Sequence, residues 1–104
     1  MLLTEALQLD KGDTVCHPAG LDYRRDGTPV KKPLRVTEAW WNEKRTIVLI
    51  RIASVAGGAW LDATGYELPP YGHKYDRIER EWVTRAEMKR RTKERRDGPA
   101  AKSA

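Results

Sequence analysis

Six basic side chains lie within eight residues near the end of the sequence, in the stretch MKRRTKERRDG at 88–98. Glu94 is the only acid among those eight residues. Clustered Lys and Arg attract phosphate-bearing polymers and release their counterions on binding. The cluster therefore predicts one of two things. It is either a polyanion-binding site or a solvated helix end, in which Arg90 pairs with Glu94 and Arg91 with Glu87.

A helix through this stretch would sort its cations onto two faces. At about 100° per residue, one broad arc of the helix carries Arg85, Lys89, Lys93 and Arg96. Arg91 and Arg95 fall roughly opposite this arc, so we expect them to contribute less to binding per charge. No apolar stripe continues past Met88, so a core does not hold the second half of the helix. The residues expected to contact phosphates are Arg85, Lys89, Arg90, Lys93 and Arg96.

A second set of candidates lies earlier in the chain. Frequent Gly and Pro predict a long exposed loop over 18–33, with a turn at Asp26-Gly27. Trp40 and Trp41 are neighbours in a predicted strand, so one ring should face the core while the other stacks a base, meets a partner or is covered by another part of the chain. Tyr23 is a further candidate for stacking on a base or contacting a partner. The loop's cations are expected to form a second phosphate-contacting cluster, and they are Arg24, Arg25, Lys31 and Lys32.

The residue types of catalysis and metal binding are sparse. Cys16 and His17 are sequence neighbours on opposite sides of a predicted strand, and His73 is distant, which falls short of the four organised ligands of a structural zinc site. The same geometry argues against a Cys-His nucleophile. Gly57-Gly58 lacks the Lys and the helix of a phosphate-binding loop. We therefore expect no enzyme activity, no metal and no cofactor.

Charge is distributed unevenly over the 104 residues, whose formal net charge is +5. Residues 1–73 carry nine Lys/Arg and nine Asp/Glu, whereas residues 74–104 carry eleven and six. This asymmetry favours an acidic partner for the last third of the chain. Cys16 is the only cysteine, which fits a reducing cytoplasm. Neither a signal peptide nor a membrane span is indicated.

The elements that would position these residues are mostly strands. Two β-rich runs around 42–45 predict a hairpin, and TIVLIRI (46–52) is apolar on both faces, as in a central strand. Residues 60–70 predict a strand, a tight turn over 62–65 and a strand ended by Pro69 and Pro70. Turn signals near every tenth residue favour a small antiparallel barrel or sandwich.

Thr84 and Glu87 have the spacing of a capping box, with Val83 and Met88 as its hydrophobic staple. This pair predicts a helix over 84–98 preceded by a strand, with Asp97-Gly98-Pro99 as its end. Residues 75–82 alone fit both the helical and the strand period. Residues 99–104 are expected to be disordered.

The order of LDKGDTV (9–15), a turn-rich loop, PLRVTEAWW (33–41), RTIVLIRI (45–52) and AWLDATGYELPP (59–70) resembles SH3-like barrels, including the KOW-type barrels of translation and transcription proteins. In those, an entry like Gly12, Asp13 and Val15 begins the first strand, and a tight turn like 62–65 precedes the last. The longer basic loop and the missing compact G-x-x-G repeat depart from the KOW pattern.

The sequence thus predicts a mostly β fold: an SH3-like antiparallel barrel over 1–83, a basic C-terminal helix over 84–98 and a tail. The function expected is non-enzymatic nucleic-acid binding, to DNA or RNA, with a homodimer as one possible state. The alternative is a small interaction or inhibitor protein, of the kind found in phages and mobile elements, that engages an acidic protein surface.

Overall fold

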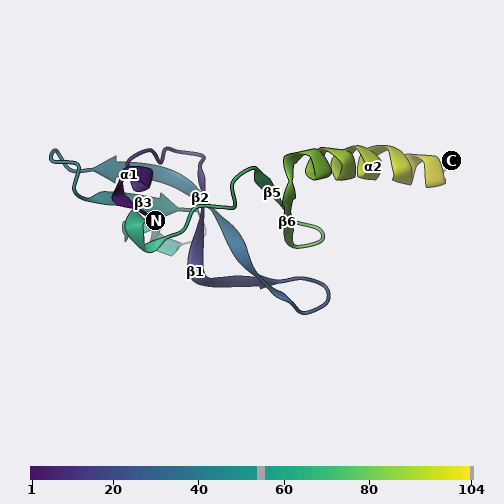
Figure 1. Cartoon of the computed structure of the whole chain (residues 1–104), viewed down its shortest axis with the longest axis horizontal. Coiled ribbons are helices and arrows are strands. Elements are labelled where there is room, and N and C mark those ends of the chain that lie inside the picture. Colours follow the sequence, from purple (N-terminus) through teal and green to yellow (C-terminus); the bar gives the residue numbers. More distant parts are fainter. Residues whose placement is uncertain (54–55, 104) are drawn as a thin grey trace.

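A curled antiparallel sheet forms the body of the protein (Figure 1). In this computed structural model, the structure describes the backbone of residues 1–53 and 56–103 and the side chains of 1–53 and 57–97. The strands follow the order β1-β2-β3-β4. Their bounds are β1 (Thr14–Tyr23), β2 (Pro29–Trp41), β3 (Val48–Ile52) and β4 (Leu61–Asp62). The predicted mostly β fold with a C-terminal helix is confirmed, and the sheet is a four-stranded half-barrel.

The core lies on the inner face of this half-barrel. Val36, Ile50 and Ile52 are almost fully buried there, and the short helix α1 (Leu3–Ala6) covers one side with Ala6. After the turn η2 (Ala63–Gly65), the chain returns to β1, where Cys16 and Glu67 exchange backbone hydrogen bonds of 2.8 and 2.7 Å. The predicted tight turn is confirmed, and the predicted last strand is reduced to this single bridge.

The predicted long loop over 18–33 is wrong, because β1 and β2 continue pairing through it as a hairpin, here called the arm. Leu21 pairs with Lys31 and Tyr23 with Pro29, beyond a register shift between Cys16 and Leu21 that accommodates the intervening Pro and Gly. Its turn lies at 24–28, where Gly27 has φ 87°. Local sequence favoured a loop, but two hydrogen bonds from outside the arm hold it: Tyr75 to Asp22 and Trp82 to the Lys31 carbonyl.

Residues 73–84 form a second, two-stranded sheet of β5 (His73–Asp76) and β6 (Glu81–Thr84). The choice between helix and strand at 75–82 is thereby settled as a hairpin, and the strand predicted before Thr84 is confirmed. The Thr84 hydroxyl accepts a hydrogen bond of 3.2 Å from the Glu87 backbone N–H, which confirms the N-cap. The Glu87 carboxylate instead binds Arg90 and Arg91, so the reciprocal half of the capping box is absent from the described contacts.

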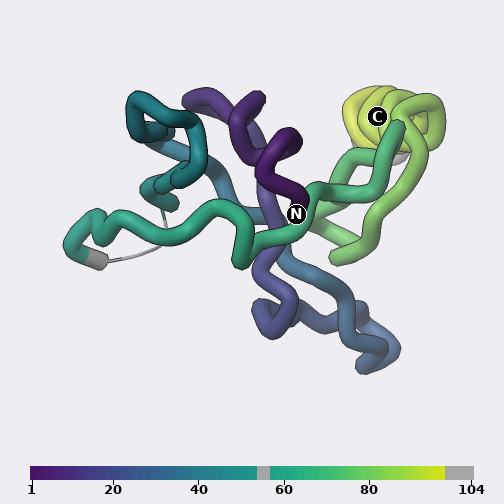
Figure 2. The backbone as a smooth tube through the Cα atoms, turned by 60° about the vertical axis from the view of Figure 1, so that its left-hand side comes forward, coloured from purple at the N-terminus to yellow at the C-terminus, as the bar shows by residue number. Residues whose placement is uncertain are grey.

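Helix α2 (Arg85–Ser103) packs against β5 and β6 and points away from the half-barrel (Figure 1). The molecule is consequently elongated, with extents of 59 × 26 × 25 Å. The arm and α2 are two separate projections (Figure 2). The helix continues beyond the end predicted at Gly98; the side chains of 98–104 lie outside the described residues, and the disordered tail stays a prediction.

Candidate functional site

One face of α2 is fastened to the β5–β6 hairpin through a buried carboxylate. Asp76, at the end of β5, has no exposed surface. Arg95 binds both of its oxygens, at 2.8 and 3.1 Å, and Arg91 binds Oδ2 at 2.9 Å. The backbone N–H groups of Ile78 and Glu79 also donate to Oδ1. A buried charge needs such full pairing, so we call this side the docking face.

Further ion pairs hold Arg91 and its neighbour Arg90, the latter within the helix itself. Arg91 also binds Glu81 at 2.8 Å and Glu87 at 2.9 Å. Arg90 lies between Glu87 and Glu94, at 2.5 and 2.6 Å. The ion pairs expected of a solvated helix end are thus present for Arg90 and Arg91, and these two cations are largely neutralised.

The ion pairs set the protonation of this face. Burial alone would raise the pKa of Asp76, but hydrogen bonds from Arg95, the Glu79 N–H and Arg91 outweigh it and hold that pKa well below 3.8. Hydrogen bonds from Arg90 and Arg91 lower the pKa of Glu87 to about 2. Both carboxylates are therefore charged at neutral pH, and Asp76 fixes the helix electrostatically to the hairpin.

The other side of α2 borders a shallow groove of about 490 Å³ against β5. The Thr92 hydroxyl turns back to the Met88 carbonyl, at 2.8 Å, so this face offers little polar contact other than its cations. Met88 contributes apolar surface. The residues that line what we call the α2 groove are Lys74, Arg85, Met88, Lys89, Thr92, Lys93 and Arg96.

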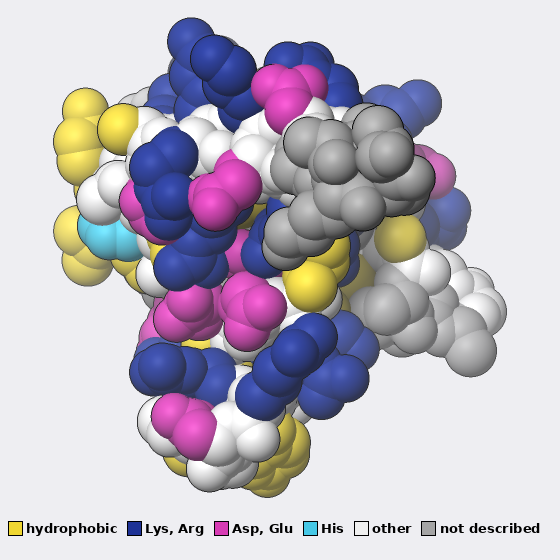
Figure 3. Space-filling model, turned by 90° about the vertical axis from the view of Figure 1, so that its right-hand side faces the viewer, with side chains coloured by type: hydrophobic (Ala, Val, Ile, Leu, Met, Phe, Trp, Pro, Cys, Tyr) yellow, Lys and Arg dark blue, Asp and Glu magenta, His cyan; other side chains and the backbone are white. Residues whose placement is uncertain are grey.

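Five cations border the α2 groove, and none of its lining side chains, within the described part of the chain, is acidic. Four of the five were predicted to share a face, and the structure brings them together. In Figure 3, Lys and Arg side chains lie around the upper edge of the molecule with an acidic side chain among them, and further Asp and Glu side chains lie below. Arg96 lies 3.5 Å from the exposed Asp97, next to it in the helix. Neighbouring like charges repel, and an anion bound between them relieves that repulsion.

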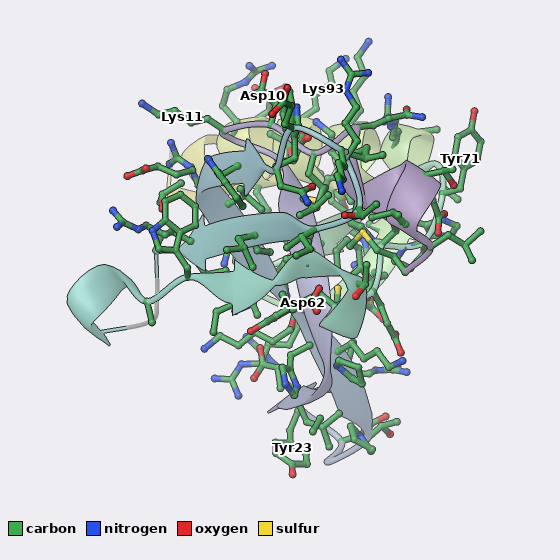
Figure 4. All side chains as sticks on the ribbon, turned by 90° about the vertical axis from the view of Figure 1, so that its left-hand side faces the viewer. Asp10, Lys11, Tyr23, Asp62, Tyr71 and Lys93 are labelled. Carbon is green, nitrogen blue, oxygen red and sulfur yellow. The ribbon has the colours of Figure 1, made fainter. Side chains whose placement is uncertain are left out.

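The cations of the arm are differently placed. Arg24 lies 3.7 Å from Glu81 and from Asp26, Arg25 lies 3.9 Å from Glu79, and Lys31 pairs with Glu67. Lys32 is exposed. Tyr23 and Lys93 point away from each other at opposite edges of the molecule (Figure 4). The structure therefore separates the two predicted clusters and does not merge them into one surface.

Trp40 and Trp41 are both partly exposed, at 47% and 44%. Trp40 pairs with Leu49 on the outer face of the sheet, and Trp41 pairs with the buried Val48 on the inner face, so the predicted opposite orientation agrees with the register. The prediction that one ring lies in the core is wrong, because Trp41 sits at the strand end, next to the β2–β3 turn.

The other aromatic rings support the structure. Trp82 donates to the Lys31 carbonyl at 2.9 Å and meets Tyr75 edge to face. Trp60 lies under the Arg51 guanidinium, 4.4 Å from the ring centre, and is 39% exposed. These contacts give Trp60 and Trp82 structural roles.

The Cys16 thiol is buried on β1. Burial, followed by the charge of Glu67, raises its pKa, so the reactive thiolate is disfavoured. His17 lies at the surface with its ring edge against Tyr66. Among the side chains that the structure describes, no group of three His, Cys, Asp or Glu residues could hold a metal ion.

We compared the chain with protein-family models, with curated proteins and with solved structures. No match is found. Within the described residues, no helix has the length and apolar character needed to cross a membrane. Function must therefore be argued from the groove itself.

Two residues of the site escaped prediction from sequence, Lys74 in the groove and Asp76 beneath the docking face. Both stand on β5, two residues apart. The period-two alternation of HKYD was the available signal, but it had meaning only once residues 75–82 were known to be strands.

Proposed function

We propose that this protein is a non-enzymatic nucleic-acid-binding module whose α2 groove holds a phosphate backbone. The observation that carries the proposal is the row of five cations without an acid among the lining side chains. Neutralising phosphates releases condensed counterions, and that release drives binding irrespective of sequence. Such contacts would position a strand without reading its bases.

The spacing of the cations supports this use. Arg85, Lys89 and Lys93 follow one another at four-residue steps, which in an α-helix means about 6 Å of axial rise per step. Lys74 faces them across the groove from β5. Three regularly spaced positive charges on a rigid helix form a linear site, which suits a polymer better than a single small anion.

The fold proposed for the half-barrel is SH3-like. The support is its chain path: four antiparallel strands, the turn η2, and a return to β1 at Glu67. This resemblance adds nothing to the choice of ligand, because folds of this size carry many functions.

The test is fluorescence anisotropy of labelled DNA and RNA oligonucleotides at several salt concentrations. The groove variant K89Q/K93Q/R96Q removes three charges from the groove, and the matched control K11Q/K44Q/R45Q removes three exposed charges elsewhere. We expect the groove variant to bind more weakly and to lower the log-log salt slope by about 2 to 3 units, with a smaller effect in the control. Equal effects in both variants, or no binding by the wild type at low salt, would refute the proposal.

A second candidate is an acidic segment of another protein. Met88 favours it, because an apolar contact between cations suits an acidic peptide with one apolar anchor. The same titration separates the two: binding to nucleic acid shows a steep salt slope, whereas a protein partner would leave the oligonucleotides unbound.

A further inference from the structure

A second hollow, of about 280 Å³, lies beside the α2 groove, and Lys74 lines both. His73, Tyr75, Arg77 and Trp82 of the β5–β6 hairpin line it, with Thr14 and Pro69 from the half-barrel side. Lys74 is thus common to the cationic groove and to a recess lined by two aromatic rings, which the strand register places on the opposite face of the hairpin from Asp76. Phosphate-binding charge next to an aromatic recess is the combination by which proteins hold single-stranded nucleic acid.

The two rings are held rigidly. Tyr75 and Trp82 meet edge to face with centres 5.2 Å apart. The Tyr75 hydroxyl donates to Asp22 at 2.7 Å, and the Trp82 Nε1–H donates to the Lys31 carbonyl at 2.9 Å. Both rings stay partly exposed while their polar edges are bound to the arm. A platform fixed in this way loses little conformational entropy when a base stacks on it.

The surroundings of the recess suit a base with its phosphate. His73 and Arg77 are exposed at its border, and Lys74 joins it to the α2 groove. Pro69 adds an apolar side. In a duplex, by contrast, bases are stacked and paired inside the helix, where they cannot enter a lateral recess.

We infer that the ligand is a single strand, with its phosphates along α2 and at least one base stacked in the recess beside Trp82. This inference rests on the function proposed above and narrows it to single-stranded nucleic acid. It also assigns a role to the arm, which holds the stacking platform in place through Asp22 and Lys31.

The deciding experiment compares three ligands of equal strand length with the wild-type protein: a 12-mer of thymidine, the same backbone with abasic sites throughout, and a 12-base-pair duplex. We expect the thymidine strand to bind roughly 5- to 150-fold more tightly than the abasic strand, which is the range of one stacked base. We also expect the two to have similar salt slopes, because both carry the same phosphates.

The outcomes separate the inference from the proposed function. Equal affinity for the thymidine and abasic strands, or tighter binding of the duplex, would overturn the base site and leave phosphate binding intact. Absence of binding to all three ligands would overturn both the base site and the proposed nucleic-acid binding.

Intrinsic fluorescence locates the base. Stacking on Trp82 should quench part of the tryptophan emission when the thymidine strand binds, and W82F should lose that quenching. W60F is the matched control, because Trp60 lies in the half-barrel against Arg51, and it should keep the quenching. Circular dichroism confirms that each variant is folded. Persistence of the quenching in folded W82F would contradict the assignment.

Discussion

The two faces of α2 carry the same residue types and have opposite surroundings. Arg91 and Arg95 reach a buried carboxylate from β5, whereas Lys89 and Lys93 border a groove with no acid among its described lining side chains. The cations of the docking face are paired within the molecule. On the groove face Arg96 lies 3.5 Å from the exposed Asp97, whereas Lys89 and Lys93 have no ion pair among the described side chains and are available to a ligand. The number of cations in a helix therefore does not measure its capacity to bind anions; the position of the acids does.

The comparison predicts its largest effect at Asp76. Replacing Asp76 by Asn should destabilise the protein by about 3 kcal/mol, because it leaves Arg91 and Arg95 beside a neutral group that can no longer balance them. Denaturant unfolding measures this. A loss below about 1 kcal/mol would mean that the ion pairs of Asp76 do not hold the helix to the hairpin.

Acid should weaken the ion pairs that Asp76 and Glu87 make. The pKa of Glu87 is about 2 and that of Asp76 is lowered from 3.8, so in the unfolded chain these groups take up protons at higher pH than in the folded one. The free energy of unfolding should thus fall as the pH drops from about 4.5 towards 2. Thermal melts across that range check it, and D76N should show a flatter profile; an identical profile in D76N would contradict it.

A matched pair of single substitutions separates the faces. Arg95→Gln and Lys93→Gln each remove one charge from the same turn of α2. We expect R95Q to lower the free energy of unfolding by about 2 kcal/mol, because the buried Asp76 carboxylate loses the two hydrogen bonds from Arg95. K93Q should change that free energy by less than about 0.5 kcal/mol. Oligonucleotide affinity at low salt should fall in folded K93Q. A large loss of stability in K93Q together with a loss of affinity confined to R95Q would contradict the roles assigned to the two faces.

A smaller loss of stability than in R95Q is expected at the start of the helix. Thr84→Ala removes the hydrogen bond to the Glu87 N–H and should cost about 1 kcal/mol, with Thr84→Ser as the control that keeps the hydroxyl. Equal melting temperatures of the Ala and Ser variants would show that the cap contributes nothing.

Local signals predicted much of this molecule. The Thr84 cap, the turn at Asp26-Gly27, the central strand around Ile50 and the shared face of Lys89 and Lys93 all depend on chemistry within a few residues of chain. These features follow from periodicity and turn preference. They were therefore accessible without knowledge of the tertiary structure.

The features that escaped prediction depend on contacts between distant segments. The arm pairs through Gly- and Pro-rich sequence because Tyr75 and Trp82, more than 50 residues away, bind Asp22 and Lys31. Likewise, Arg95 is a structural residue only because Asp76 lies 19 residues earlier on a strand whose period was ambiguous. No local pattern encodes either contact.

Which surface binds nucleic acid is best tested by mapping backbone amide shifts by NMR while a 12-mer of thymidine is added. The account predicts shifts concentrated at Lys74 and along 85–96, extending to Tyr75 and Trp82, with little change at the tip of the arm or around Trp40. Shifts centred on Arg24 and Arg25 or on the outer sheet face, or none at saturating ligand in low salt, would contradict the central claim.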